Sequence, residues 1–85
     1  MEQNNLYITL KKLLEEEEFN KGEDLLYKAL YKYKSQEVYE LGQWFYNYLL
    51  NQHDKVLEYK NFNRREIFNG LEDLQKFKEK YLING

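Results

Sequence analysis

The stretch from Ser35 to Leu50 constrains the fold of this chain more than any other part of its sequence. On a helical wheel at about 100° per residue, its large apolar side chains cover roughly two-thirds of the circumference and leave a narrow polar strip. A helix that is apolar over so wide an arc is normally covered by neighbouring elements on several sides. We therefore expect this helix at the centre of a small helical domain.

Helical patterns also precede and follow this central helix. Leucines spaced by three and four residues predict a first helix over about residues 5–17, and a second helix is predicted over 20–33. The central helix is expected to span 36–51, followed by a short turn over 54–60 and a last helix over 64–82. Because the chain has no proline and few β-branched residues, an all-α fold is expected. We predict a single domain, residues 1–85, whose four main helices form two antiparallel hairpins, with the short turn before the last helix.

One pattern occurs twice: an aromatic residue followed by Asn, a basic residue, any residue and Glu. It is found at Phe19–Glu23 and again at Phe62–Glu66. In each copy the Asn is a favourable N-cap, and the Glu three residues later can complete a capping box. The pattern therefore predicts that two helices begin in the same way, after Asn20 and after Asn63.

Other residues mark helix ends and one close contact. Asn4 or Asn5 can cap the first helix, and Ser35 can cap the central helix. Asn84-Gly85 is a natural stop for the last helix. Glycine inside a helix costs about 1 kcal/mol relative to alanine. We therefore expect another helix to approach closely at Gly70, inside the last helix.

Composition limits the classes of function open to the chain. Without cysteine there is no disulfide, no thiolate chemistry and no Cys-based zinc site. The single histidine, His53, stands in a polar break, where a surface position or a local cap on the carbonyls of the central helix explains it. No metal-ligand motif and no glycine-rich phosphate loop is present. We predict no catalytic residue, no cofactor-binding residue, no metal ligand and no cofactor, and hence no enzyme.

The sequence also bears on location and on charged partners. Its N-terminus shows no apolar run of signal-peptide length, and no segment approaches the roughly 20 apolar residues of a membrane span. A cytoplasmic protein that does not enter a membrane is expected. The net charge of −2, from 13 basic and 15 acidic residues, is too balanced to attract nucleic acid or an anionic membrane strongly.

Aromatic residues are abundant for so small a chain: 18% of its residues are Phe, Trp or Tyr, and nine are tyrosines. Tyr and Trp anchor many protein interfaces, because they combine a large apolar ring with a polar atom. The alternative is that these rings only fill an undersized core. We predict a protein-interaction or adaptor module whose partner is another protein or a second copy of the chain. The candidate contact residues, in so far as they stay uncovered, are Tyr27, Tyr31, Tyr39, Trp44 and Tyr46.

A second hypothesis rests on basic side chains just before and at the start of the last helix. Basic residues with aromatic residues among them can hold phosphates and stack bases. Glu58 and Glu66 dilute this charge, so nucleic-acid binding is the less favoured alternative. The residues of this predicted basic patch are Lys55, Lys60, Arg64 and Arg65.

The first three helices contain a resemblance to tetratricopeptide repeats. Residues 19–30, with Gly22, Leu26 and Ala29 at small–large–small spacing, resemble the second helix of that repeat. Leu41-Gly42-x-x-Phe45 resembles part of a repeat's first helix. The chain departs from the repeat at Leu10, where glycine is usual, and no proline closes either unit. The resemblance implies helical hairpins with a concave surface for a protein partner.

The third and fourth helices also resemble a family of small uncharacterised helical proteins from low-GC Gram-positive bacteria. The similar residues are Trp44–Asn47, then Phe62–Ile67 and Gly70–Leu74. This resemblance covers about half of the chain and implies a helical fold and a bacterial source. It implies no activity.

Overall fold

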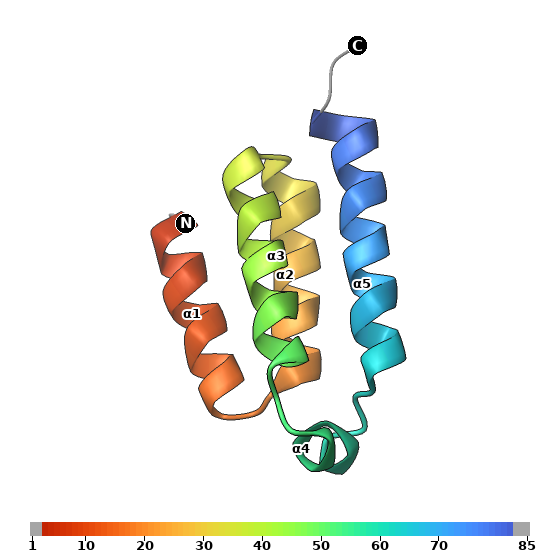
Figure 1. The fold of residues 1–85 in the computed structure, drawn as a ribbon. Coiled ribbons are helices and arrows are strands. Elements are labelled where there is room, and N and C mark those ends of the chain that lie inside the picture. Colours follow the sequence, from red (N-terminus) through yellow and green to blue (C-terminus); the bar gives the residue numbers. More distant parts are fainter. Residues whose placement is uncertain (1–2, 83–85) are drawn as a thin grey trace.

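The computed structural model describes residues 3–82 of the chain, and no strand occurs among them (Figure 1). The predicted all-α fold is confirmed. A π-helical segment, η1, continues the last α-helix. The elements are α1 (Gln3–Glu15), α2 (Phe19–Tyr33), α3 (Gln36–Leu50), α4 (Asp54–Tyr59), α5 (Arg64–Phe77) and η1 (Lys78–Leu82). The stop expected at Asn84-Gly85 lies outside the described residues, as does the side chain of Asn4.

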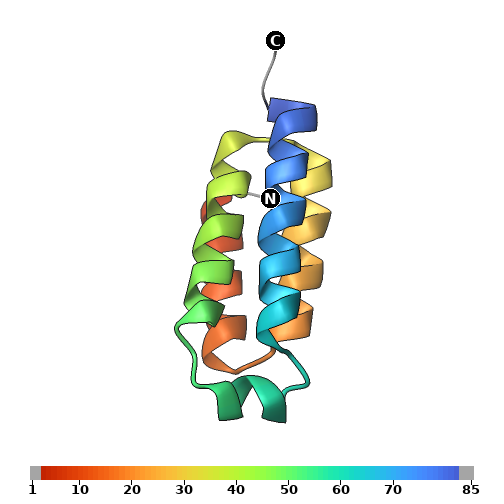
Figure 2. The same cartoon turned by 45° about the vertical axis from the view of Figure 1, so that its right-hand side comes forward.

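Helix α3 lies in the middle of the molecule, where the sequence analysis placed it. It contacts α1, α2 and α5, while α1 also contacts α2. Figures 1 and 2 show α1 antiparallel to α2 and α3 antiparallel to α5, with α4 crossing the end between α3 and α5. As a result α2 and α5 run in the same direction, on two different sides of α3.

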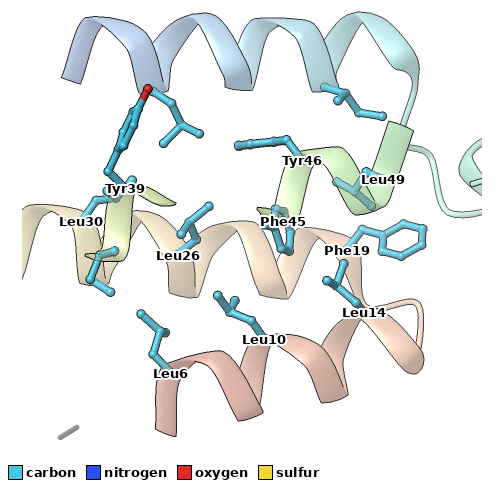
Figure 3. Packing of buried hydrophobic residues seen from close by; sticks show 14 of the residues in the cluster. Leu6, Leu10, Leu14, Phe19, Leu26, Leu30, Tyr39, Phe45, Tyr46 and Leu49 are labelled. Carbon is cyan, nitrogen blue, oxygen red and sulfur yellow. The ribbon is translucent and has the colours of Figure 1, made fainter. Parts of the chain in front are cut away.

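The core joins side chains from every α-helix. In Figure 3, leucines of α1 point towards α2 and α3, and Tyr46 of α3 points towards α5. Glycines allow the closest approach of α5 to α3. A Cβ atom at Gly70 would collide with the ring of Tyr46, and one at Gly42 would lie 2.8 Å from Cδ2 of Leu74. The close approach expected at Gly70 is therefore confirmed, and it holds the ring of Tyr46.

The ends of α1 differ from those expected. The helix begins at Gln3, so Asn5 lies within it and does not cap it. It ends at Glu15 because Glu17 adopts a left-handed conformation with φ 59°. The N–H groups of Glu17 and Glu18 then donate to the carbonyls of Leu14 and Leu13 at 3.0 and 2.8 Å, which closes the helix with a left-handed turn.

The capping prediction is right for α3 and α5 but wrong for α2. The side chain of Ser35 accepts a hydrogen bond from the N–H of Val38 at 3.1 Å, and Asn63 accepts one from the N–H of Glu66 at 2.8 Å. Helix α2 instead begins at Phe19, which places Asn20 inside the helix. The N-cap is Glu18, whose side chain makes no cap hydrogen bond.

Candidate interaction groove

The five predicted contact residues are divided between the core and the surface. Tyr39 and Tyr46 are 4% and 0% exposed, so they belong to the core and cannot contact a partner. Trp44 is half-buried, with its ring against α1. Tyr27 is half-buried and Tyr31 is 54% exposed, both on α2. Of the five, the structure brings Tyr27 and Tyr31 together on one hollow surface.

Tyr27 and Tyr31 line a groove between α2 and the helix formed by α5 and η1, which we call the α2–α5 groove. It consists of two hollows, of about 650 and 420 Å³, that share Tyr27, Tyr31 and Asp73. The ring of Tyr31 packs edge-on against Phe77 and Tyr81, with centroid distances of 5.3 and 6.1 Å. An aromatic row thus runs from one wall of the groove to the other.

Hydrogen bonds beneath the groove hold α2 in place. The hydroxyl of Tyr27 donates to the carbonyl of Gly70 at 3.2 Å, which joins α2 directly to α5. The hydroxyl of Tyr46 donates to a carboxylate oxygen of Glu23 at 2.5 Å. This bond gives the polar atom of a fully buried ring the partner that burial requires.

Burial shifts the ionisation of these three groups towards their neutral forms. The pKa of Glu23 is raised, mainly by burial and also by nearby carboxylates such as Glu66, although the bond from Tyr46 opposes this. Burial raises the pKa of Tyr27 to about 12. The pKa of Tyr46 is raised mainly by burial and also by its hydrogen bond to Glu23. Both tyrosines therefore remain neutral hydrogen-bonding groups near neutral pH.

Charged residues follow a definite order along the α2–α5 groove. Glu23 and Asp24 line one end, and Lys76 and Lys80 line the other. Between the ends, Asp73 on α5 lies across the groove from α2, which carries Lys28. Within residues 3–82 the ion pairs are Lys21–Glu18 and Arg64–Asp54, so none of these groove charges forms an ion pair among the described residues.

Arg64, from the predicted basic patch, is occupied by contacts inside the molecule. Its guanidinium donates to a carboxylate oxygen of Asp54 at 2.7 Å. It also donates to the carbonyls of Leu50 and Gln52 at 3.0 and 3.1 Å. These bonds tie the start of α5 to the end of α3 and leave Arg64 little capacity for a phosphate.

The other basic residues of the patch differ in their surroundings. Lys60 is half-buried, with its ammonium 5.4 Å from the ring centroid of Tyr59, while Lys55 and Arg65 are exposed. His53 caps α4 rather than α3: its Nδ1 accepts from the N–H of Lys55 at 3.4 Å. The structure thus assigns the histidine a local structural role.

Sequence reasoning missed the α5 and η1 side of the groove. From their spacing, Phe77 and Tyr81 were predicted only to lie on the buried side of the last helix. Glu23 was assigned to a capping box. The available signal was the spacing of Tyr27 and Tyr31, one helical turn apart and beside the main apolar stripe of α2. That spacing indicates a second contact face on α2, but it does not show which helix lies opposite.

The chain matches a known protein family. The pattern of DUF6483, a family of unknown function, matches residues 1–79 of the chain. No curated protein and no solved structure matches it. Among the described residues, no helix is long and apolar enough to cross a membrane, and no cluster of three or more His, Cys, Asp or Glu is arranged to hold a metal ion.

Proposed function

We infer the role of this chain, which belongs to the DUF6483 family of unknown function, from its own surface. We propose that it is a small, non-catalytic protein-interaction module whose partner binds in the α2–α5 groove. The observation that carries this proposal is the position of Tyr31. Its ring is 54% exposed although it packs against the buried ring of Phe77 and the half-buried ring of Tyr81, so one largely open tyrosine ring lies in a hollow that has an aromatic wall.

Tyrosine in a preformed hollow is a favourable anchor for a partner. Aromatic side chains that become covered at the centre of an interface supply a large share of binding energy. The Tyr27–Gly70 hydrogen bond fixes one wall of the groove to the other before a partner arrives. Such pre-organisation lowers the entropic cost of binding. An amphipathic helix fits a groove between two helices and would cover this aromatic row.

Two finer statements belong to the same proposal. We place the protein in the cytoplasm of a bacterium, a proposal supported by the composition. The tetratricopeptide-like relationship stays a prediction. Its support is local: Gly22 gives room to Phe45, whose Cε1 would lie 2.8 Å from an added Cβ.

Nucleic-acid binding through Lys55, Lys60, Arg64 and Arg65 remains the alternative. The internal contacts of Arg64 and the ring contact of Lys60 lower its support. The two functions differ in their response to salt. Phosphate contacts should weaken steeply as salt is added, while a contact formed mainly by aromatic side chains should change little.

Site-specific cross-linking tests the proposed groove. A photo-reactive amino acid is placed at Tyr31 in one variant and at Tyr59 in a control, since Tyr59 is 80% exposed on α4, outside the groove. After irradiation in cells of the source organism, we expect a defined protein adduct from position 31 that is missing from position 59. Equal adduct patterns from both positions, or none from position 31, would contradict a partner in the groove.

A matched variant separates binding from folding. Tyr27→Ala combined with Tyr31→Ala should abolish the complex. Tyr31→Ala alone should weaken the complex while leaving the melting temperature nearly unchanged, because more than half of this side chain is already exposed. A Tyr31→Ala protein that melts earlier but keeps its partner would show that the ring serves packing alone.

A further inference from the structure

We propose that the partner in the α2–α5 groove is the same groove of a second copy of this chain, with the two copies antiparallel about a two-fold axis. This inference rests on the proposed function, to which it adds the identity of the partner. It predicts a symmetric homodimer in which α2 and α5 of each copy form a four-helix interface.

The order of charges along the groove favours a second copy. Glu23 and Asp24 lie at one end, Lys76 and Lys80 at the other, and none of them forms an ion pair within residues 3–82. A two-fold rotation that reverses the helix direction brings the acidic end of each copy to the basic end of the other. Because the interface is isologous, each such contact occurs twice.

The charges in the middle of the groove are also matched with opposite charges by this rotation. Tyr27 is level with Gly70 and Tyr31 with Phe77, which places Asp73 on α5 and Lys28 on α2 near the middle of the groove. The rotation that pairs the ends also brings Asp73 of one copy towards Lys28 of the other. Along the length of the groove each acidic level thus comes opposite a basic level of the other copy, whereas a parallel arrangement would bring levels of like charge together.

The direction of the helices gives independent support. Within one copy α2 and α5 run in the same direction (Figures 1 and 2), so their macrodipoles add. An antiparallel second copy opposes these dipoles across the interface. It also covers the exposed ring of Tyr31 with the equivalent apolar surface of its neighbour. A helix from a different protein would need the same order of charges to match the groove equally well.

The experiment uses charge reversal on the full chain. In one variant Asp24→Lys and Asp73→Lys make the groove positive, and in the other Lys28→Asp and Lys76→Asp make it negative. All four residues are exposed, so both variants should fold, which circular dichroism can verify. The matched control, Lys11→Asp with Lys12→Asp, changes the same number of charges on the outer face of α1.

Size-exclusion chromatography with light scattering at micromolar concentrations gives the readout. We expect the unaltered chain and the control at twice the 10.6 kDa of one chain. Each groove variant alone should dissociate, with Kd raised about tenfold or more, because like charges then meet twice across the two-fold axis. An equimolar mixture of the two groove variants should recover the dimer mass, because positions 24 and 73 of one variant then carry charges opposite to those at positions 76 and 28 of the other.

Three results would overturn the inference, and they are distinguishable from failure of the proposed function. A monomer at every concentration, together with a different protein cross-linked at position 31, would refute the dimer. It would still support the groove as the binding site of another protein. A dimer that ignores both charge reversals would use another surface. Dissociation of both variants without recovery on mixing would exclude the antiparallel arrangement.

Discussion

The same five-residue pattern occurs at Phe19–Glu23 and Phe62–Glu66, and the two copies behave differently. In the second copy Asn63 caps α5, as the pattern predicts. In the first copy Asn20 lies inside α2, and Glu23 accepts a hydrogen bond from Tyr46 of α3 instead. A local motif therefore makes a cap available, but the surrounding chain decides whether the cap forms.

The approach of the chain to each helix explains the difference. Before α2 the chain leaves the left-handed turn at Glu17, and the N–H of Gly22 bonds to the carbonyl of Glu18, so the helix starts ahead of Asn20. Before α5 the left-handed residue is Asn61, two positions ahead of Asn63, which leaves Asn63 extended as a cap requires. One residue of difference in the turn changes the use of the whole motif.

What the two copies share is the aromatic residue, and this gives the largest expected effect. Phe19 and Phe62 are each 1% exposed, and their rings pack edge-on with centroids 6.2 Å apart. Phe19→Leu and Phe62→Leu should each lower the free energy of unfolding by about 1–2 kcal/mol. Because the rings contact each other, the double variant should lose less than the sum of the single losses. Urea denaturation measures all three, and strict additivity would show that the ring contact carries no coupling energy.

Substituting the asparagine of each copy of the pattern should have a smaller effect on stability, and a different one in the two copies. Asn63→Ala removes the acceptor for the N–H of Glu66 and should lower the free energy of unfolding by about 1 kcal/mol. Asn20→Ala should change it by less than about 0.5 kcal/mol, because Asn20 is exposed and does not cap α2. Thermal unfolding of the two variants side by side gives the comparison. Equal losses would mean that Asn20 caps α2 in solution.

The smallest effect concerns pH and the two glutamates of the pattern. The folded chain holds the proton of Glu23 more tightly than the unfolded chain, because burial raises its pKa above the ordinary value of 4.5. The folded state then binds more protons than the unfolded state as pH rises from about 4.5. The contribution of Glu23 to stability should therefore be largest below that pH and fall as pH rises through its raised pKa.

Glu23→Gln isolates this contribution. The difference in melting temperature between the Gln variant and the unaltered chain should grow in favour of the variant from pH 4 to pH 7. Glu66→Gln gives the comparison: it removes one of the carboxylates that raise the pKa of Glu23, so it should shift the melting temperature with pH in the same direction but by less. A difference that stays constant with pH would show that Glu23 titrates normally.

The sequence alone predicted the class of fold and several local details for identifiable physical reasons. Periodicity located the helices, and Ser35 and Asn63 were correctly assigned as caps because capping depends on nearby residues. Gly70 was correctly assigned as a point of close approach, because glycine inside a helix needs such a reason. These features depend on local chemistry that a single sequence contains.

The groove could be predicted only in part. Tyr27 and Tyr31 were among the candidates, yet so were Tyr39 and Tyr46, which the core covers. Which tyrosines stay open depends on the place where α5 lies against α3. That place is set by the short helix α4 and by the internal contacts of Arg64, and helical periodicity contains no signal for either.

The late position of α5 in the chain has a consequence for translation. Helices α1, α2 and α3 follow one another and contact one another, so they can associate as soon as they leave the ribosome. The side of α3 that carries Tyr46 stays uncovered until Gly70 and its neighbours have been synthesised. At 5–20 residues per second this takes about 1–5 s more. During that interval one side of α3 is uncovered and the groove has not formed. A chaperone would bind that side of α3, and a dimer could form only after α5 has been synthesised.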